Sequence, residues 1–286
     1  MFKIGELEIH AVNAGVVWMD RGGPFGLVPR ALWSRYLPPD DLDRVPMVLT
    51  CLVVRAGDRT VLVDTGLGDK LDDKTRDLWN LQYPNGTLVE GLARLGVAPA
   101  DVDMVINTHL HGDHCAGNTA FGPDGTLVPV FSNAEYVVQR REYEDAMQPN
   151  ERTRATYLPA NYEPLVQSGQ MRFLEGDTGL LPGIRVVVTP GHTPGHQCVL
   201  FEAGAQRALF MADLASYAVH FERLGWMTAY DVEPLVTLET KRRWTQWALD
   251  TNALLIFQHD TQILAGYLTE GEDGKRHVVP VEAQYV

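Results

Sequence analysis

Three histidines and one aspartate lie within six positions of the stretch NTHLHGDHCAG, directly after an apolar run. His109 and His111 are two residues apart, so at the end of an extended strand both side chains point to the same side. Asp113 and His114 flank the turn that Gly112 allows, because glycine has no side chain to restrict the backbone. Imidazole nitrogens and carboxylate oxygens are the ligands that zinc and related metals prefer. The spacing therefore predicts a metal site in this short segment.

Further ligand candidates lie downstream, each at the end of a predicted strand: His192, Asp213 and His259. Strand ends are where α/β architectures place functional residues. The combined set contains five histidines and two aspartates. It is large enough for two metals with three ligands each and one carboxylate shared between them, which is the arrangement of a two-metal hydrolase.

Strands and helices must bring these distant segments together. Alternating or continuous apolar residues with Gly and Asp at the turns predict strands, and leucines three to four residues apart predict helices. Strands are predicted in 2–12, 104–109, 184–202, 207–215 and 253–260, hairpins in 48–66 and 263–281, helices in 87–96 and 236–252, and a strand followed by a helix in 128–147. This order predicts an α+β fold, an αββα sandwich of two mixed sheets packed face to face with helices outside. We expect one domain, residues 1–286.

Composition narrows the function classes. With 286 residues, of which 45% are apolar, the chain can bury a sizeable core. Its 24 basic and 37 acidic residues give a net charge of −13, which repels nucleic acids and anionic membrane surfaces. We expect no nucleic-acid or membrane partner and, without a signal peptide or a long apolar run, a cytoplasmic location. The three widely spaced cysteines, Cys51, Cys115 and Cys198, are expected to be small buried residues.

The ordered ligand pattern resembles that of the metallo-β-lactamase superfamily. The stretch VDTG, residues 63–66, is similar to a strand end behind the ligands in that family, and the likeness runs from about Met47 to His259. The resemblance implies two zinc ions per chain, with other divalent metals as alternatives. It assigns one ion to His109, His111 and His192, the other to Asp113, His114 and His259, and the bridge to Asp213.

Departures from individual branches of the superfamily narrow the choice. Asp213 stands where one subclass of zinc β-lactamases has a cysteine, and His111 stands where the flavodiiron branch has a glutamate. The chain has no room for the inserted domain of the RNA-cleaving branch. It also lacks the GCGR-like stretch that follows the bridging aspartate in glyoxalase II and the persulfide dioxygenases. The remaining similarity is to quorum-quenching lactonases and their organophosphate-hydrolysing relatives.

This resemblance implies a dinuclear zinc hydrolase that opens lactones or related esters, such as acyl-homoserine lactones, by attack of a metal-bridging hydroxide. Phosphotriesterase chemistry would be a side activity. Three alternatives stay open: a thioester hydrolase like glyoxalase II, a β-lactamase, and a metal-binding regulatory protein that has kept the fold without turnover.

Two aspartates and two further residues are candidates for catalytic roles. Asp113 or Asp213 would pass a proton to the leaving oxygen. The resembling lactonases have a tyrosine shortly after the bridging aspartate that reaches the substrate carbonyl. Tyr217 lies four residues after Asp213, and His220 is a second candidate in the same loop. The alternative for Tyr217 is a tyrosine packed in the core.

Other residues are expected to support the site. Asp64 is expected to orient a ligand imidazole, and His196 to stabilise a turn next to the site without binding metal. The apolar stretch 18–39 is broken by Gly and Pro and is expected to form no regular element. It is either a lid over a small-molecule substrate pocket or a contact in a homodimer; its candidate pocket residues are Phe25, Leu27, Trp33 and Tyr36.

Overall fold

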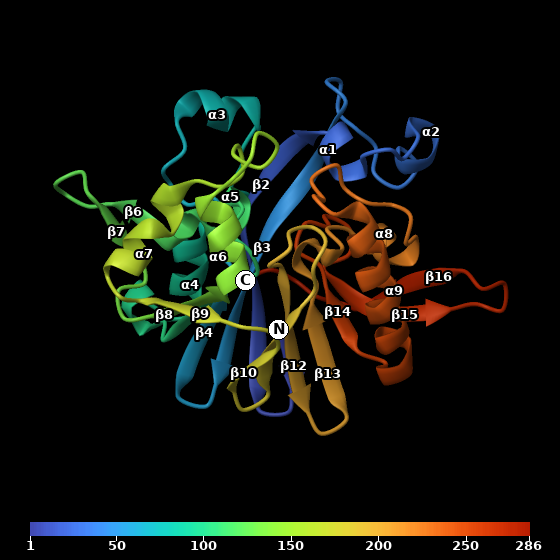
Figure 1. Ribbon diagram of the computed structural model, residues 1–286. Helices are drawn as coiled ribbons and strands as arrows, with labels where there is room; N and C mark the ends of the chain where they lie inside the picture. The colour runs from blue at the N-terminus through green and yellow to red at the C-terminus, as the bar shows by residue number, and fades with distance from the viewer.

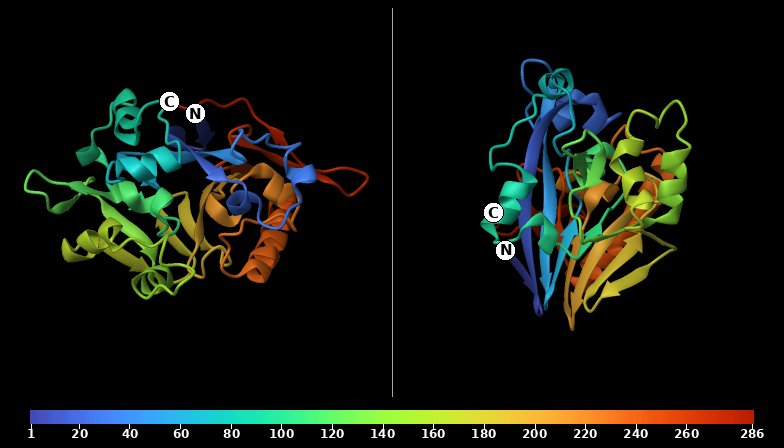
Figure 2. Two further views of the ribbon diagram at one scale, coloured as in Figure 1. Left: turned by 90° about the horizontal axis from the view of Figure 1, so that it is seen from above. Right: turned by 90° about the vertical axis from the view of Figure 1, so that its left-hand side faces the viewer.

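Two seven-stranded mixed sheets pack face to face in the computed structural model, which describes residues 1–286 (Figure 1). Helices α4, α6 and α7 lie on one side of the paired sheets and α8 and α9 on the other (Figure 1), and the layers are seen from two further directions in Figure 2. The predicted αββα arrangement is confirmed.

The first sheet is built from the amino-terminal part of the chain. Its strands are β1 Phe2–Ile4, β2 Leu7–Asp20, β3 Arg44–Ala56, β4 Arg59–Val63, β5 Met104–Ile106, β8 Glu135–Gln139 and β9 Met171–Leu174, in that spatial order. Neighbours from β1 to β4 are antiparallel, whereas β4, β5, β8 and β9 run parallel. Because β4, β5 and β8 are parallel, the segments that follow them leave the same edge of the sheet.

The second sheet follows in the carboxyl-terminal part. Its strands are β10 Thr178–Leu181, β11 Ile184–Val188, β12 Gln197–Ala203, β13 Gln206–Phe210, β14 Leu254–Ile256, β15 Ala265–Glu270 and β16 Arg276–Pro280, again in spatial order. Only β13 and β14 are parallel in this sheet. A separate small hairpin consists of β6 Thr119–Phe121 and β7 Leu127–Pro129.

Helices connect the strands and cover the sheets. They are α1 Gly22–Phe25, α2 Arg30–Trp33, α3 Asp73–Leu78, α4 Leu88–Arg94, α5 Gly112–Cys115, α6 Arg140–Met147, α7 Glu163–Gln167, α8 Ala218–Glu222 and α9 Pro234–Thr251, with short 3-10 turns at Pro99–Asp101, Ala116–Asn118, Pro159–Asn161 and Ala212–Leu214. Helix α4 begins at a capping box formed by Thr87 and Glu90. Helix α9 starts with proline and ends at Asn252 in the left-handed conformation. None of the helices is long and apolar enough to cross a membrane.

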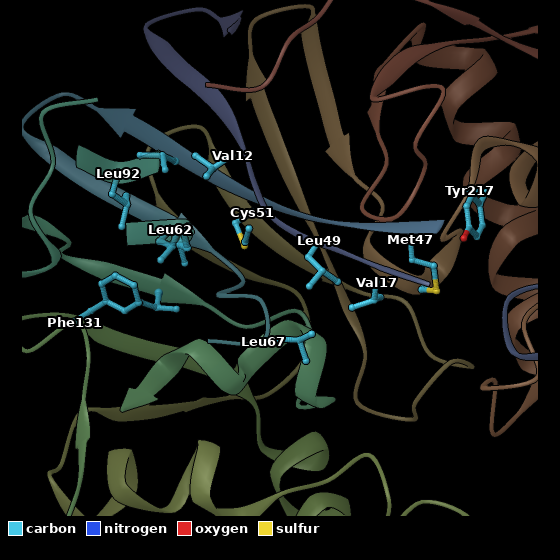
Figure 3. Packing of buried hydrophobic residues seen from close by; sticks show 14 of the residues in the cluster. Val12, Val17, Met47, Leu49, Cys51, Leu62, Leu67, Leu92, Phe131 and Tyr217 are labelled. Atoms are coloured by element: carbon cyan, nitrogen blue, oxygen red, sulfur yellow. The ribbon is translucent and has the colours of Figure 1, made fainter. Parts of the chain in front are cut away.

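Apolar side chains fill the space between the sheets and beneath the helices. Ile9, Phe201 and Phe210 belong to the cluster between the two sheets, and each is fully buried. Burying one such side chain stabilises the fold by roughly 1.5–3 kcal/mol. A second cluster covers the other face of the first sheet, from Phe131 at one end to Tyr217 at the other (Figure 3). All three cysteines are buried and free, as expected.

Two local predictions were wrong. Residues 2–12 form a hairpin and not one strand, because the chain turns at Gly5, whose φ of 57° suits glycine. The stretch 18–39 contains regular structure: β2 continues to Asp20, where it pairs with Arg44 of β3, and α1 and α2 follow. These short helices have no side-chain caps, so their sequences carry little signal.

Candidate metal centre

The segment after β5 carries four of the seven predicted ligands. Residues 107–111 leave the parallel strands at the edge where β4 and β8 also end, with a bend at Thr108. His109 and His111 lie in this irregular segment, His111 with an extended backbone, while Asp113 and His114 lie in α5, which begins at Gly112. The bend and the helix together let all four side chains face one centre.

The remaining three ligand candidates come from the second sheet. His192 lies in the loop after β11, Asp213 lies in the 3-10 turn after β13, and His259 follows β14. Ala212, directly before Asp213, has a φ of 43°, a conformation that is strained for a residue with a side chain. Such strain is often found at functional sites because the surrounding structure enforces it.

The structure brings all seven predicted ligands together as two groups. Ligand atoms of His109, His111, His192 and Asp213 lie within 4.8 Å of one another, and a second group of the same kind consists of Asp113, His114 and His259. Asp213 reaches both groups: Oδ2 lies 3.1 Å from His192 Nε2, and Oδ1 lies 3.1 Å from His259 Nε2.

These residues fit a metal better than a network of hydrogen bonds. The Nε2 atoms of His109, His114 and His259 are buried and have no hydrogen-bond partner in the protein. Buried polar nitrogens without partners are costly, so they point to an ion that would satisfy them. Burial, reinforced by the neighbouring imidazoles, holds the pKa of His109 well below its usual value and keeps the ring neutral, as a ligand must be.

Hydrogen bonds from the opposite nitrogen orient three of the imidazoles. Nδ1 of His114 lies 2.9 Å from Asp64 Oδ2, and Nδ1 of His192 lies 2.9 Å from Asp231 Oδ1. Nδ1 of His259 donates to the carbonyl of Val48 at 2.8 Å. Each of these bonds leaves Nε2 facing the centre of the site. Asp64 therefore lies where an orienting carboxylate was expected; Asp231 was not predicted.

His196 does not face the ligand groups with a free nitrogen. Its Nδ1 lies 2.8 Å from the hydroxyl of Thr189, and its Nε2 accepts the backbone N–H of Asp213 at 3.1 Å. Burial, with the nearby His192, lowers the pKa of His196 to about 3. The neutral ring thus ties the backbone of Asp213 to the turn before β12.

A pocket of 140 Å³ opens above the ligands and is lined in part by His111, Asp113, His192 and Asp213. Its apolar wall consists of Val17, Met19, Met47, Leu67, Leu71, Ala116, Trp79, Ala155 and Leu158. Larger hollows of 380 and 580 Å³ lie elsewhere on the molecule and contain none of the seven predicted ligands. The small hollow with four of the predicted ligands at its base is the candidate active site.

The four residues expected to line this pocket do not lie in it. Phe25 and Trp33 are fully buried and stack on each other at 5.3 Å between ring centroids, because their apolar rings pack into the core. The hydroxyl of Tyr36 donates to Asp260, and Leu27 is fully exposed beside the 580 Å³ hollow. Within 18–39, Phe25 and Trp33 are therefore part of the core, whereas Met19 at the end of β2 lines the pocket.

Tyr217 and His220 are also placed away from the pocket. The hydroxyl of Tyr217 donates to the carbonyl of Pro46 at 3.0 Å, and its ring stacks on Phe25 at 5.6 Å. His220 is buried, and burial, with the charge of Lys241, lowers its pKa to about 3. Neither side chain lines the pocket that contains the ligands.

A tyrosine that was not among the residues predicted from the sequence lies in the pocket. Tyr230 lines the pocket, and its hydroxyl makes no hydrogen bond within the protein. Burial raises its pKa, and the carboxylates of Asp113 and Asp213 raise it further, so the phenol keeps its proton. Its position depends on Gly23, where any Cβ would overlap the phenol oxygen. No motif around residue 230 signals this placement.

The family model described as the metallo-β-lactamase superfamily matches residues 44–232. The chain belongs to this superfamily and is a metal-dependent hydrolase. It is 30% identical over 243 residues to an N-acyl homoserine lactonase of a Bacillus species, covering 79% of this chain and 86% of the relative. An N-acyl homoserine lactonase of Bacillus cereus is 28% identical over 272 residues, with 89% and 94% covered.

Solved structures share the whole fold. A "probable metal-dependent hydrolase" from Staphylococcus aureus is 27% identical, with a TM-score of 0.88 and all of both chains covered. AidC, a dizinc quorum-quenching lactonase bound to a product, has a TM-score of 0.80 at 20% identity, with 99% of this chain and 97% of that chain covered. At that identity the likeness establishes the shared fold.

Proposed function

We propose that the protein is a dinuclear zinc hydrolase that opens lactones, those with an acyl or alkyl chain foremost. The observation that carries this proposal is the pocket in which one wall is apolar and the base contains residues of both ligand groups. The apolar wall would contact the acyl or alkyl chain of the substrate, and metals held by the ligand groups would lie next to its ester. Relatives that are named N-acyl homoserine lactonases support the same substrate class.

The ligands would hold one zinc at His109, His111 and His192 and another at Asp113, His114 and His259, with Asp213 between them. A bound zinc pair supplies Lewis acidity and makes water acidic enough to be a nucleophile near neutral pH. In the overall reaction, water adds to the lactone carbonyl carbon and the ring C–O bond breaks. The products are a carboxylate and a hydroxyl group.

The protein's own residues would orient the ester and move one proton. Tyr230 would donate its hydroxyl to the substrate carbonyl oxygen, because Tyr230 lines the pocket and its hydroxyl makes no hydrogen bond within the protein. Asp113 would accept the proton that the attacking water loses and pass it to the leaving ring oxygen, since its side chain is 30% exposed. Asp213 is only 7% exposed and already accepts a hydrogen bond from Ser216.

A hydrolysis screen of the zinc-loaded protein tests the proposal. The substrates are an acyl-homoserine lactone, an aliphatic lactone, an aryl ester, a phosphotriester, a glutathione thioester and a penicillin. We expect the lactones to have the highest kcat/KM, by about tenfold or more over the thioester and the penicillin. The reverse order would contradict lactonase activity and leave the metal-dependent hydrolase in place.

A matched pair of variants separates turnover in the pocket from background hydrolysis. Asp113→Asn changes a carboxylate that is proposed both to bind zinc and to carry the proton, and it should lower kcat by roughly 10²-fold or more. Asp124→Asn changes an exposed aspartate in the turn between β6 and β7 and should leave kcat unchanged. Equal rates for both variants would mean that the observed hydrolysis does not occur at this site.

A further inference from the structure

Glu142 is an acidic residue that lies buried beneath the metal centre. It is in the first turn of α6, where its neighbours Arg141 and Glu144 are exposed, whereas Glu142 itself is 0% exposed. Its carboxylate forms no ion pair with lysine or arginine. Burying a carboxylate without such a partner is costly, and burial raises the pKa of Glu142. Hydrogen bonds must therefore compensate for its lost hydration.

Three donors converge on this carboxylate. Oε1 accepts the backbone N–H of Leu110 at 3.0 Å and the hydroxyl of Tyr157 at 2.9 Å. Oε2 accepts the hydroxyl of Thr193 at 2.6 Å. The three donors come from three separate loops, so Glu142 joins segments that are distant in the sequence.

Each donor adjoins a ligand of the first group. Leu110 lies between His109 and His111, and Thr193 directly follows His192. The ring of Tyr157 lies 5.1 Å from that of His111, and the two residues form a bridge of antiparallel backbone.

One carboxylate therefore ties the loop after β5, from the first sheet, to the loop after β11, from the second. The loops also approach α6 closely: at Gly195, three residues after His192, a Cβ would overlap the backbone of Glu142.

The second group has other supports. His114 is oriented by Asp64, and His259 is oriented by the carbonyl of Val48. Neither contact involves Glu142, whose hydrogen-bond partners adjoin only first-group residues. The contacts of Glu142 thus adjoin only the first group, whereas the hydroxyl of Thr108 lies near Nδ1 of both His109, at 3.1 Å, and His114, at 3.4 Å.

We infer that Glu142 is a positioning residue that sets the metal affinity of the group His109, His111, His192 and leaves that of Asp113, His114, His259 unaffected. This inference rests on the proposed two-metal site. A residue that merely stabilised the fold would weaken both groups or neither, so the difference between the groups distinguishes the two roles.

Glu142→Gln tests the inference because it keeps the side chain's shape but replaces one acceptor oxygen with a donor. We expect the affinity of the first group for Zn²⁺ to fall by about 10- to 100-fold, the usual effect of losing a partner that orients a metal ligand. The second group should keep its affinity. Glu144→Gln, an exposed change on the same helix, is the matched control and should alter neither.

Single-site backgrounds assign the effect to one group. With His259→Ala the metal that remains is held by the first group, and Glu142→Gln should weaken it; with His192→Ala it is held by the second, and Glu142→Gln should not. Competition between apoprotein and a chelator of known affinity measures each constant without an activity assay. Circular dichroism checks the fold of every variant.

Thr193→Val and Tyr157→Phe keep the experiment decisive if Glu142→Gln does not fold. Each removes one donor and leaves the carboxylate in place, and each should weaken only the first group by a smaller factor. Equal loss at both groups, or no loss at either, would overturn the inference while leaving the two-zinc proposal intact. A wild-type protein that binds a single metal would contradict the two-zinc proposal. The inference then stands only if Glu142→Gln lowers the affinity of the protein for that metal.

Discussion

At the scale of single residues, the question is which tyrosine near the pocket has a hydroxyl that is not already hydrogen-bonded within the protein. Tyr217 lies close to Asp213 in sequence, but its hydroxyl is used in a hydrogen bond to Pro46. Tyr230 lies farther along the chain, lines the pocket and has a hydroxyl without a hydrogen-bond partner in the protein. Proximity to Asp213 in the sequence thus favours Tyr217 as the substrate-contacting residue, whereas position in the pocket favours Tyr230. Contact with substrate requires a position in the pocket.

Tyrosine-to-phenylalanine substitutions separate these two residues. Tyr230→Phe should lower kcat for a lactone by roughly 10- to 100-fold, because a donor to the carbonyl oxygen is lost. Tyr217→Phe should change kcat little but reduce the free energy of unfolding by about 1 kcal/mol, the worth of one hydrogen bond. Steady-state kinetics, urea unfolding and zinc content should be measured for both variants. A large kinetic defect in Tyr217→Phe alone would reverse the assignment.

At the scale of elements, the segment from α1 to Tyr36 braces the loops that follow β13 and β14. The carbonyl of Gly23 accepts the backbone N–H of Ala229 at 2.8 Å. The hydroxyl of Tyr36 donates to Asp260, which directly follows His259 and also accepts the N–H of Ala218. This segment therefore contacts the backbone next to Tyr230 and the side chain next to His259 without entering the pocket.

Gly23→Ala tests this brace. The added methyl group would occupy the position of the Tyr230 hydroxyl, so the ring must move. We expect kcat to fall by about as much as in Tyr230→Phe, with zinc content unchanged because no ligand is touched. Gly225→Ala is the control, since a Cβ there meets nothing within 4 Å and should leave kinetics unchanged. Similar kinetics for both variants would show that α1 does not set the position of Tyr230.

Helix α9 supports the same region through a buried lysine. Lys241 is 1% exposed, and its ammonium donates to the carbonyls of His220, at 3.1 Å, and Trp226, at 2.7 Å. Burial lowers its pKa from 10.5 to about 8. The unfolded chain therefore holds this proton over a pH range in which the folded protein has released it.

This difference predicts the direction of a pH effect. Between about pH 8 and pH 10.5 the unfolded state binds more protons, so the lysine's contribution to stability rises with pH. Compared with Lys241→Met, which cannot titrate, wild type should gain up to about 3 kcal/mol of unfolding free energy across this window. Urea unfolding of both proteins at several pH values measures the gain. A difference that does not change with pH would mean an ordinary lysine pKa.

The sequence was informative where local pattern and function coincide. His192, Asp213 and His259 could be predicted because each follows a short apolar strand, and strand ends converge at a sheet edge. Tyr230 and Glu142 could not, because only packing between distant segments gives them their roles. An acidic residue near a helix start normally faces water, so nothing in the sequence marked Glu142 as buried.

The misplaced pocket residues have a related cause. Apolar character correctly indicates that Phe25 and Trp33 avoid water, and both are fully buried. It does not tell whether the apolar surface faces a substrate or the core, because both environments exclude water equally. Their stacking beside Tyr217 could be seen only once the three segments were placed together.

At the scale of the whole molecule, each ligand group draws on both sheets. The first takes His109 and His111 from the amino-terminal part and His192 from the carboxyl-terminal part; the second takes His114 and His259 in the same way. A metal bound at either group would therefore link the two layers of the sandwich. Metal binding and stability should be coupled, because the unfolded chain does not hold these ligands together.

Removal of metal measures that coupling. At a free zinc concentration about 1,000 times the dissociation constant, one bound ion stabilises the folded state by roughly 4 kcal/mol. Chelation should accordingly lower Tm by several degrees, and zinc should restore it. Magnesium should not, because it prefers oxygen ligands over the imidazoles of these groups. A Tm that does not respond to chelation would contradict a resident metal.

The loop between β9 and β10 is a position at which the chain could be divided so that each predicted metal-binding group is split between two fragments. Gly176 is exposed there, and it separates all four ligands of the amino-terminal part from the three of the carboxyl-terminal part. A chain divided at this loop yields two fragments, neither of which holds a complete ligand group. Zinc should therefore drive their reassociation, and reporter proteins fused at the cut would make the pair a split sensor whose signal follows the concentration of free metal.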